Sequence, residues 1–442
     1  MLMGRHEIDA NGFFLMPIRL LGHWGGLPNG SCPSLFSFDD DASSGKIERF
    51  GPLPLNFTAD RTMHNILLIS GTRPEIIKLA PVYHALRAVR WASVQWLHTG
   101  QHDEMAQQIL ACFDVVPDVS LTRAGASLLD FSIGCRLQLE DVMRRQKYSL
   151  VMVQGDTESA FQGALAAFYN RVPLAHVEAG LRTHNLSRPF PEEGLRQMIS
   201  RITRYHFAPT ERARAILQAE GVADVHIHMT GNTVIDAQQW TCAHRGVKRA
   251  VGGRGHLLVT VHRRENWGDD VAQICHAVAD IARLQPDLPI LFPVHLNPVI
   301  QEPVYKILGH VANVRLTAPL DYTQMQQALV DAWLVLTDSG GLQEEAPTFG
   351  VPVLVLRDET ERPEAVEAGC ALVIGSSREA IVSHVSHLAA DAGTYARMAH
   401  AGNPFGDGTA SRQIVEALAH TFFTPSSIAS THGQRETATA PG

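Results

Sequence analysis

The chain of 442 residues lacks any long hydrophobic run. No segment approaches the roughly 20 apolar residues that a membrane-spanning helix requires, so we expect no membrane insertion. Positive charge is not in excess either: 37 Lys and Arg against 45 Asp and Glu give a net charge of −8. Nucleic-acid binding relies on clustered basic charge, so we expect no nucleic-acid partner. A globular protein of two to three domains remains, at roughly 150 residues per domain.

Several motifs for metals, disulfides and cofactors are also missing. The six cysteines are scattered and include no Cys-x-x-Cys pair, which favours a reduced, cytoplasmic chain. The 22 histidines include no His-Glu-x-x-His motif, so we expect no metal. The chain contains neither Gly-x-Gly-x-x-Gly nor Gly-x-x-x-x-Gly-Lys-Ser/Thr. A dinucleotide cofactor and a P-loop are therefore disfavoured, and we expect no cofactor.

The two ends of the chain differ from its middle. Residues 1–62 contain Gly25-Gly26 and the run Asp39-Asp40-Asp41, without a sustained period of 2 or 3.6 residues. Residues 423–442 are rich in Ser and Thr. We predict a disordered N-terminal extension at 1–62 and a disordered tail at 423–442.

Between these ends, short apolar or β-branched runs alternate with helical patterns such as 76–90 and 158–169. This alternation is typical of parallel sheets covered by helices on both faces. The runs, ten in all, are 65–70, 94–99, 150–154, 173–177, 226–230, 257–261, 290–294, 313–318, 333–337 and 353–356. They separate into two groups of five near residues 232–255. We predict an α/β fold with two Rossmann-like doubly wound domains, 63–235 and 236–422, facing a central cleft.

Polar residues follow the predicted strands rather than being scattered. In open parallel sheets, ligands bind outside the carboxyl ends of the strands, so both domains would direct these loops at the cleft. Loops of this kind are polar in any case, because they carry caps and turns. The richness of these in Arg, His and carboxylates nevertheless favours a site. Examples are Gly155-Asp156-Thr157, Glu178-Ala179-Gly180-Leu181-Arg182, His262-Arg263-Arg264-Glu265-Asn266 and Asp338-Ser339-Gly340-Gly341.

Two glycine turns indicate an anionic ligand. Ser339-Gly340-Gly341 joins a strand to a helix, where free backbone N–H groups and the helix dipole favour phosphate. Gly71-Thr72-Arg73-Pro74 forms a second such turn, and Pro74 suits the first position of a helix. Arg73, Lys78 and Arg362 would add positive charge. Together these features predict a ligand that carries a diphosphate.

Three carboxylates and one histidine are candidates for acid–base chemistry. Asp156 can be read simply as a helix N-cap, and Glu192 as an acidic residue in the first turn of a helix. Glu178 is harder to dismiss, because a carboxylate at the end of an apolar strand is costly to bury without a partner. His262 ends a strand of the second half. Acid, base and anion cradle together favour an enzyme, and we expect the carboxylates to lie near His262 and Ser339.

Several long motifs resemble those of the non-hydrolysing UDP-N-acetylglucosamine 2-epimerases, in family order over residues 63–419. The resemblance implies a fold of the glycosyltransferase-B type that holds the nucleotide mainly in the second domain, and usually a homodimer. The motifs are Gly71-Thr72-Arg73-Pro74-Glu75, Lys78-Leu79-Ala80-Pro81, His176-Val177-Glu178-Ala179-Gly180-Leu181-Arg182-Thr183, Pro189-Phe190-Pro191-Glu192-Glu193, Thr230-Gly231-Asn232-Thr233-Val234-Ile235-Asp236, His262-Arg263-Arg264-Glu265-Asn266, Asp338-Ser339-Gly340-Gly341-Leu342-Gln343-Glu344-Glu345-Ala346-Pro347 and Thr360-Glu361-Arg362-Pro363-Glu364.

The resemblance also implies an isomerase that interconverts UDP-N-acetylglucosamine and UDP-N-acetylmannosamine by eliminating and re-adding UDP, without a cofactor or metal. Matched by motif, the catalytic residues are Asp156, Glu178, Glu192 and His262. The substrate-binding residues are Arg73, Lys78, Ser339, Gly340, Gly341, Glu345 and Arg362, with Glu345 at the ribose. Gln101, Arg136, Arg263 and His295 map to a site where bacterial relatives often bind substrate as an activator. Glu158 and Leu320 depart from the family pattern.

Three other functions remain open on the sequence. A relative could act on a modified UDP-sugar, such as a uronic acid or a diacetamido sugar. A hydrolysing epimerase would release N-acetylmannosamine and UDP, although no kinase domain accompanies this chain. A binding or regulatory protein with an inactive cleft is disfavoured by the intact carboxylates and both glycine turns.

Overall fold

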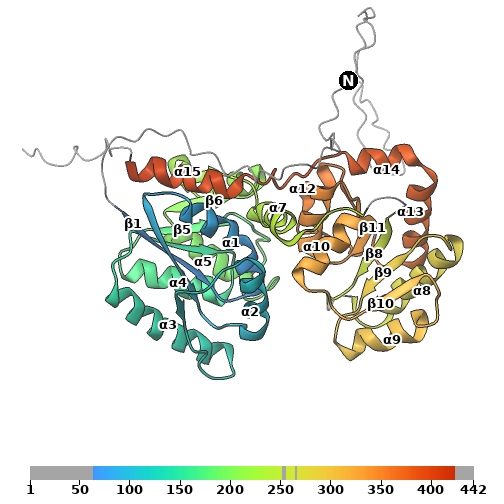
Figure 1. Ribbon diagram of the computed structural model, residues 1–442, viewed down its shortest axis with the longest axis horizontal. Coiled ribbons are helices and arrows are strands. Elements are labelled where there is room, and N and C mark those ends of the chain that lie inside the picture. The colour runs from blue at the N-terminus through green and yellow to red at the C-terminus, as the bar shows by residue number, and fades with distance from the viewer. Residues whose placement is uncertain (1–62, 251–254, 264–265, 424–442) are drawn as a thin grey trace, which may run out of the picture. The chain divides into compact units, whose positions relative to one another are not determined.

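The computed structural model of the protein describes residues 63–250, 255–263 and 266–423 (Figure 1). The predicted extension at 1–62, and all but the first residue of the predicted tail, lie outside this part. Among the described residues, no helix combines the length and apolar character needed to cross a membrane.

The described chain forms two parallel sheets. The first has seven strands in the order β3-β2-β1-β4-β5-β6-β7, and the second has six in the order β10-β9-β8-β11-β12-β13. The first sheet consists of β1 His64–Ser70, β2 Ala92–His98, β3 Val119–Ser120, β4 Leu150–Gln154, β5 Leu174–Val177, β6 Tyr205–Ala208 and β7 Ile227–Met229. The second consists of β8 His256–Thr260, β9 Ile290–Pro293, β10 Val314–Thr317, β11 Ala332–Thr337, β12 Val353–Val355 and β13 Ala371–Val373.

Helices connect the strands and cover the sheets (Figure 1). The first half contains α1 Arg73–Arg87, α2 Asp103–Cys112, α3 Leu128–Arg145, α4 Glu158–Tyr169, α5 Glu192–Ile202, α6 Glu211–Ala219 and α7 Thr233–Arg245. The second contains α8 Asp269–Leu284, α9 Pro298–Leu308, α10 Tyr322–Asp331, α11 Gly340–Glu345, α12 Pro363–Glu367, α13 Arg378–Ala390, α14 Ala392–Ala399 and α15 Ala410–Phe423. The α/β class and the two doubly wound sheets are as predicted.

The prediction of two groups of five strands is wrong in number. The sequence reading missed β3, β6 and β13, which have only two to four residues each. A two-residue run such as β3 leaves no period to recognise, but length alone does not explain the other two misses, because β7 and β12 have three residues each and were predicted. The predicted helix at 158–169 agrees with α4, whereas the one at 76–90 begins three residues earlier, at Arg73.

Strand β1 shows why both faces of the first sheet are covered. Alternate side chains of a strand point to opposite faces. Ile66 and Leu68 pack in one core with α1 and α2, whereas Leu67 and Ile69 pack in another with α3 and α4. All four are fully buried. The near-continuous apolar run of β1 therefore reflects burial on both sides.

The strand order places the ligand-binding edge of each sheet. In doubly wound sheets the crevice lies where the order reverses, outside the carboxyl ends of the strands. The reversal falls between β1 and β4 in the first sheet, and between β8 and β11 in the second. Thr337 of β11 pairs with Thr260 of β8, so the loops that begin at Val261 and Asp338 leave the sheet side by side.

Two chain segments connect the halves. Helix α7 packs on α1, and the C-terminal helix α15 returns to pack on both α1 and α7. Asp236 of α7 accepts hydrogen bonds from the backbone N–H groups of Ala410 and Ser411, and the Asn232 N–H donates to the Phe405 carbonyl. The domain boundaries at 235/236 and 422 stay a prediction.

Two buried histidines lie side by side in the first sheet, where His176 of β5 pairs with His206 of β6. Burial lowers the pKa of His176 to about 3 and that of His206 to about 4. Both rings therefore stay neutral in the folded protein at pH values where an unfolded chain, with a pKa near 6.5, takes up protons.

We expect the free energy of unfolding to fall as the pH drops below 6.5. Below that pH the histidines of the unfolded chain bind protons, whereas the buried rings of the folded protein stay neutral. Each ring contributes about 1.4 kcal/mol per pH unit down to its native pKa. Urea unfolding at pH 7, 6 and 5 measures this slope. His206→Gln should remove about one ring's share, and equal slopes for the two proteins would refute the prediction.

Candidate functional site

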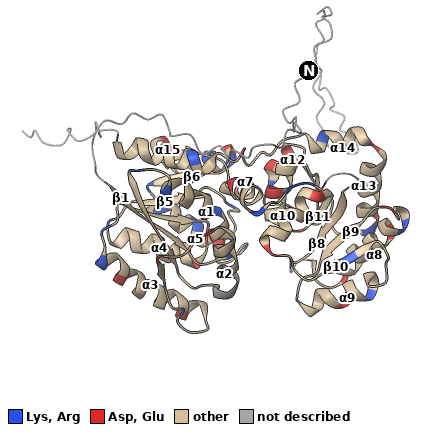
Figure 2. Ribbon diagram, in the orientation of Figure 1, with Lys and Arg blue, Asp and Glu red and all other residues tan. Residues whose placement is uncertain are grey.

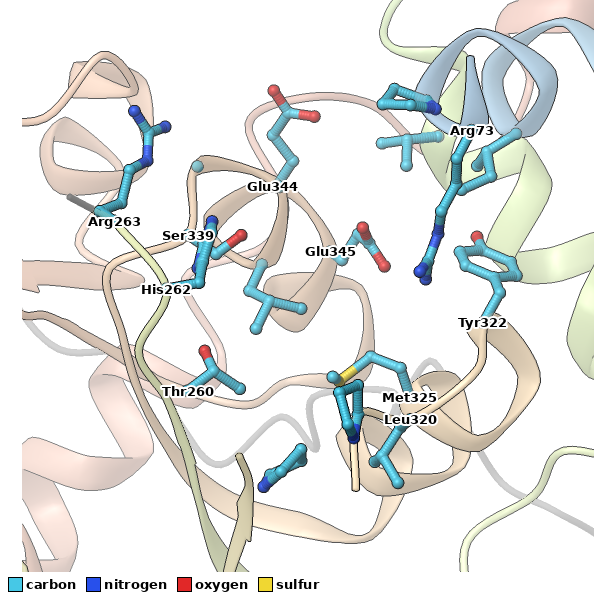
Figure 3. A pocket seen from close by; sticks show the side chains of 18 of the residues that line it. Arg73, Thr260, His262, Arg263, Leu320, Tyr322, Met325, Ser339, Glu344 and Glu345 are labelled. Atoms are coloured by element: carbon cyan, nitrogen blue, oxygen red, sulfur yellow. The ribbon is translucent and has the colours of Figure 1, made fainter. Parts of the chain in front are cut away.

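A cavity of about 560 Å³ opens at the carboxyl ends of the second sheet, beside the start of α1 (Figure 3). This volume lies within the usual range for sites of small ligands. Nine of the residues predicted to act on or bind substrate or activator line it: Arg73, Lys78, His262, Arg263, His295, Ser339, Gly340, Gly341 and Arg362. Glu345, also predicted, lines it as well, together with Tyr322, Glu344 and an apolar group that includes Leu320 and Met325.

The switch point between β8 and β11 forms one wall of the cavity. The hydroxyls of Thr260 and Thr337 hydrogen-bond at 2.6 Å, which joins the two strand ends. The Ser339 N–H donates to the Thr337 hydroxyl at 2.9 Å. Helix α11 begins directly after Ser339, so Ser339, Gly340 and Gly341 turn their backbone toward the cavity (Figure 3). The predicted glycine turn of the second half therefore lies at the site.

The glycine turn of the first half differs from the prediction. The backbone N–H groups of Gly71 and Thr72 donate to the Glu75 carboxylate at 2.9 and 2.7 Å, and the Thr157 hydroxyl donates to its other oxygen at 2.6 Å. Glu75 completes a capping box at the start of α1, where Pro74 is the second residue. The donors expected to bind phosphate there are already satisfied, so this half supplies side chains such as Arg73 and Lys78 instead.

A cluster of opposite charges joins α1 to α11 and α12. Lys78 Nζ lies 2.6 Å from Glu178 Oε1 and 3.6 Å from Glu344 Oε2. Glu344, only 2% exposed, also accepts hydrogen bonds from Arg362 Nε and from Asn232 Nδ2. Figure 2 shows acidic and basic positions close together around α12 and β11. Two of the three basic residues predicted to bind diphosphate, Lys78 and Arg362, thus share one carboxylate.

The pairing keeps Lys78, Arg362 and Glu344 ionised. Burial alone would lower the pKa of Lys78, but the carboxylates of Glu178 and Glu344 outweigh it and raise that pKa. The pKa of Arg362 is likewise raised, because the negative charge of Glu344 overcomes the desolvation. Burial opposes ionisation of Glu344, yet Arg362 and Lys78 hold its pKa below the usual value. Lys78 and Arg362 therefore remain positively charged where they line the cavity.

Two buried amide side chains, those of Gln326 and Gln238, hold Glu345 in place through a chain of hydrogen bonds. Gln326 of α10 donates to Glu345 Oε2 at 2.5 Å, and Gln238 of α7 donates to Gln326 at 2.8 Å. Burial raises the pKa of Glu345 to about 7, with Gln326 opposing that rise and Glu344 adding to it. Figure 3 shows the Glu345 side chain directed into the cavity near Arg73 and Tyr322. A carboxyl group in this position can bind ligand hydroxyls.

The three carboxylates predicted to be catalytic do not line the cavity directly. Glu178 follows β5 next to Gln154 of β4, which donates to its carboxylate, and reaches the cavity wall through Lys78. Its φ of 65° is left-handed, a conformation that costs a non-glycine residue about 1–3 kcal/mol. The surrounding structure therefore holds this carboxylate in place against backbone strain.

Asp156 is bound to helix α5, the helix that Glu192 opens. The Arg196 guanidinium binds Asp156 and lies 3.4 Å from Glu193. Glu192 opens the same helix one turn before Arg196, as predicted for an acidic first turn. The alternative reading of Asp156 as an N-cap is wrong, because the Thr157 hydroxyl caps α4 by accepting from the Ala160 N–H.

The four residues mapped to an activator site divide into two groups. Arg263 and His295 line the cavity. Gln101 instead accepts hydrogen bonds from the backbone N–H and hydroxyl of Ser159 on α4. Arg136 lies on α3, where it pairs with Glu140 at 2.6 Å and stacks over Tyr169. No group of three His, Cys, Asp or Glu residues suited to a metal ion occurs in the described part of the chain.

Sequence reasoning gave no role to several residues that shape the site. Asp338, fully buried, directly follows strand β11. The argument that singled out Glu178, a carboxylate ending an apolar strand, applies equally to Asp338 and could have found it. Glu344 carried a weaker signal, as one of two adjacent acids in a helix that follows a glycine turn. Gln326 and Arg196 carried none, because only the folded chain brings them to their partners.

Comparisons with known proteins agree with this geometry. A family model described as UDP-N-acetylglucosamine 2-epimerase matches residues 84–419. A UDP-N-acetylglucosamine 2-epimerase of Escherichia coli (strain K12) is 45% identical over 369 residues, which cover 80% of this chain and 98% of the relative.

Two solved structures share the fold. The UDP-GlcNAc 2-epimerase of Neisseria meningitidis, bound to UDP-GlcNAc, has a TM-score of 0.73 at 38% identity over 80% of this chain and 99% of its own. That of Methanocaldococcus jannaschii, in complex with UDP-GlcNAc and UDP, has a TM-score of 0.66 at 30% identity over 81% and 100%. The glycosyltransferase-B type of fold and the isomerase class are thereby confirmed. On the family match and these identities, the chain belongs to the UDP-N-acetylglucosamine 2-epimerase family.

Proposed function

We propose that this protein interconverts UDP-N-acetylglucosamine and UDP-N-acetylmannosamine by eliminating UDP and adding it back. The observation that carries the proposal is one cavity lined together by Lys78, Arg362, His262 and the Ser339–Gly341 turn. Cations, an imidazole and a backbone turn are suited to a diphosphate that must leave and return. The UDP-GlcNAc bound by the Neisseria meningitidis relative supports the same ligand.

The chemistry explains why a diphosphate clamp is required. The hydrogen on the second sugar carbon is not acidic, since no carbonyl lies beside that carbon. A base removes this proton while the C1–O bond to UDP breaks, and the electron pair forms a C1=C2 double bond. Addition of UDP to C1, with a proton delivered to C2 from the opposite face, yields the epimer. This sequence needs an acid–base pair, a held leaving group and a cleft that retains the intermediate.

The first sheet supplies the acid–base groups in this proposal. Asp156, Glu178 and Glu192 are the candidates, and Glu178 is the one linked through Lys78 to the diphosphate clamp. His262 meets the leaving diphosphate. The ribose hydroxyls fit Glu345, whose pKa of about 7 lets the carboxyl group accept or donate. The uracil fits the apolar wall of Pro319, Leu320 and Met325.

Three further parts of the proposal concern the setting of the enzyme. A substrate molecule acting as activator would meet Arg263 and His295, with Gln101 in the turn before α2 and Arg136 on α3. The described cysteines Cys112, Cys135, Cys242, Cys275 and Cys370 are free thiols, which fits a cytoplasmic location. The enzyme would act as a homodimer.

An apolar stripe on helix α3 supports the dimer. Leu129, Ile133 and Leu137 recur every four residues, lie on one face of the helix and are 67%, 55% and 64% exposed. Phe168 and Tyr169 are exposed at the end of α4, which packs against α3. A self-complementary patch of this kind suits a two-fold interface with a second copy of the chain.

Wild-type protein with UDP-N-acetylglucosamine in heavy water should form UDP-N-acetylmannosamine and exchange the hydrogen at C2 for deuterium, because the proton passes through an acid–base group. Proton NMR follows both changes. Full retention of the C2 hydrogen in the product would refute elimination. Free N-acetylmannosamine with UDP would indicate a hydrolysing enzyme, and turnover only of uronic or diacetamido UDP-sugars would indicate a modified substrate.

Glu178→Gln should lower kcat by about 10²–10⁴-fold, the usual contribution of a general acid or base. UDP should still bind, since Arg362 and the Ser339–Gly341 turn are unchanged. Turnover assays and calorimetric titration with UDP measure the two effects. Glu367→Gln, at an exposed carboxylate on α12, is the matched control. Near-normal turnover of the Glu178 variant would remove this residue from the chemistry.

Ile133→Asp should convert the dimer to a monomer, because it places a charge in the centre of the apolar stripe. Size-exclusion chromatography with light scattering measures the mass. Val225→Asp, at a 75% exposed residue outside α3 and α4, should leave the dimer intact. A monomeric wild type, or a dimeric Ile133 variant, would contradict the proposed interface.

A further inference from the structure

The carboxylate of Asp338 is fully buried at the end of β11 and contacts the imidazole of His262. Asp338 Oδ1 lies 2.8 Å from His262 Nδ1. Oδ2 accepts from the backbone N–H groups of His262 and Arg263, at 3.0 and 2.8 Å, and from Asn266 Nδ2 at 3.0 Å. One oxygen therefore organises the loop after β8, and the other meets the imidazole ring.

The register of the second sheet brings these groups together. Thr337 and Thr260 are paired, so the residue after β11 faces the chain that leaves β8. Burial opposes ionisation of Asp338, but the hydrogen bond and charge of His262 and the two backbone N–H groups outweigh it and lower the pKa of Asp338. The aspartate is therefore an anion, and the Nδ1 atom that faces it carries a proton.

This contact fixes the chemistry of the ring. A carboxylate at Nδ1 stabilises the tautomer with its proton on Nδ1 and fixes the ring plane. Nε2 is then the nitrogen available to a bound ligand, and His262 lines the cavity beside Ser339 (Figure 3). A doubly protonated ring would donate from Nε2 to an anion while Asp338 balances its charge.

We infer that Asp338 is a positioning residue: by accepting from Nδ1–H of His262 it orients the ring with Nε2 toward the leaving diphosphate, and it balances the positive charge of the ring when Nε2 also carries a proton. The inference rests on the proposed function for the identity of that leaving group. As the C1–O bond breaks, negative charge grows on the diphosphate, and the Nε2–H of the imidazolium donates to it. When UDP adds back to C1, the negative charge on the diphosphate falls and the hydrogen bond from His262 Nε2–H weakens.

Asp338→Asn separates this role from the folding of the loop. The amide oxygen can take the place of Oδ2 and accept from the backbone, while the amide nitrogen faces Nδ1 and donates to it. The neutral ring must then carry its proton on Nε2. We expect kcat to fall by about 10²–10³-fold, because the ring then meets the diphosphate only as a neutral donor and without an orienting carboxylate, whose loss at a histidine has an effect of this size or more.

Nitrogen-15 NMR of histidine-labelled protein reads the tautomer without any need for activity. The His262 signals are assigned by their loss in His262→Gln. At alkaline pH, wild type should show the Nδ1–H form and Asp338→Asn the Nε2–H form. A neutral wild-type ring protonated on Nε2 would overturn the inference, even if the variant does not fold.

A double-mutant cycle supplies the kinetic half of the test. If Asp338 acts through His262, adding Asp338→Asn to His262→Gln should cost less than about threefold in kcat. An equal loss in both backgrounds would mean that Asp338 only holds the loop. Asp236→Asn is the matched control, because Asp236 is a buried carboxylate that accepts from two backbone N–H groups. It should leave the His262 tautomer unchanged.

The two hypotheses fail in different ways. If wild type shows the Nδ1–H tautomer but epimerises no UDP-sugar, the proposed function is wrong and the positioning of His262 stands. If wild type epimerises while Asp338→Asn keeps both the tautomer and kcat, the positioning inference is wrong and the function stands.

Discussion

A shared carboxylate, Glu344, holds the site together. Burying charge is costly unless each ion is closely paired, and removing one partner of a buried pair typically costs about 3–5 kcal/mol. Glu344 binds Arg362 within the second half and Lys78 from the first, while Lys78 also neutralises Glu178. The cations that face the cavity and a carboxylate proposed for catalysis therefore belong to one network. Any change in the approach of α1 to α11 would disturb the proposed diphosphate clamp and the proposed acid–base group together.

The two sheets have the same topology around their switch points but use them differently. After β1, the N–H groups of Gly71 and Thr72 donate to the side chain of Glu75. These two donors in the turn toward α1 are therefore not available to a ligand. After β11, Asp338 instead turns back to the loop after β8, and the Ser339–Gly341 turn lines the cavity. In this proposal the second half supplies backbone and imidazole to an anion, and the first half supplies side-chain cations and carboxylates. This asymmetry agrees with a nucleotide held mainly by the second half.

The sequence predicted those parts of the fold whose pattern is long. Helix α4, with its run of small apolar residues, was predicted with its bounds. Strand β3 was missed because two residues leave no readable period, whereas β6 and β13 were missed although β7 and β12, which are no longer, were predicted. The cap of α4 was assigned one residue too early: Asp156 and Thr157 both suit an N-cap, and only the backbone decides which one faces the Ala160 N–H. Most site residues followed from motifs, because the glycine turns and strand ends mark the ligand edge of each sheet.

The sequence could not show which residues contact the buried acids Glu178 and Asp338. Glu178 and Asp338 have the same linear signature, an acid directly after a buried strand, which says only that each needs a partner. Their uses differ because their neighbours differ. Lys78, one hundred residues away, and Gln154 of the adjacent strand meet Glu178, whereas Asp338 meets two backbone N–H groups and an imidazole. Glu178 pairs with a cation, Lys78, that also lines the cavity proposed for the diphosphate. Asp338 instead contacts the imidazole of His262, which it is proposed to orient. The partners that each buried acid meets, which no local pattern encodes, thus distinguish the acid proposed to take part in proton transfer, Glu178, from the one proposed to position its neighbour, Asp338.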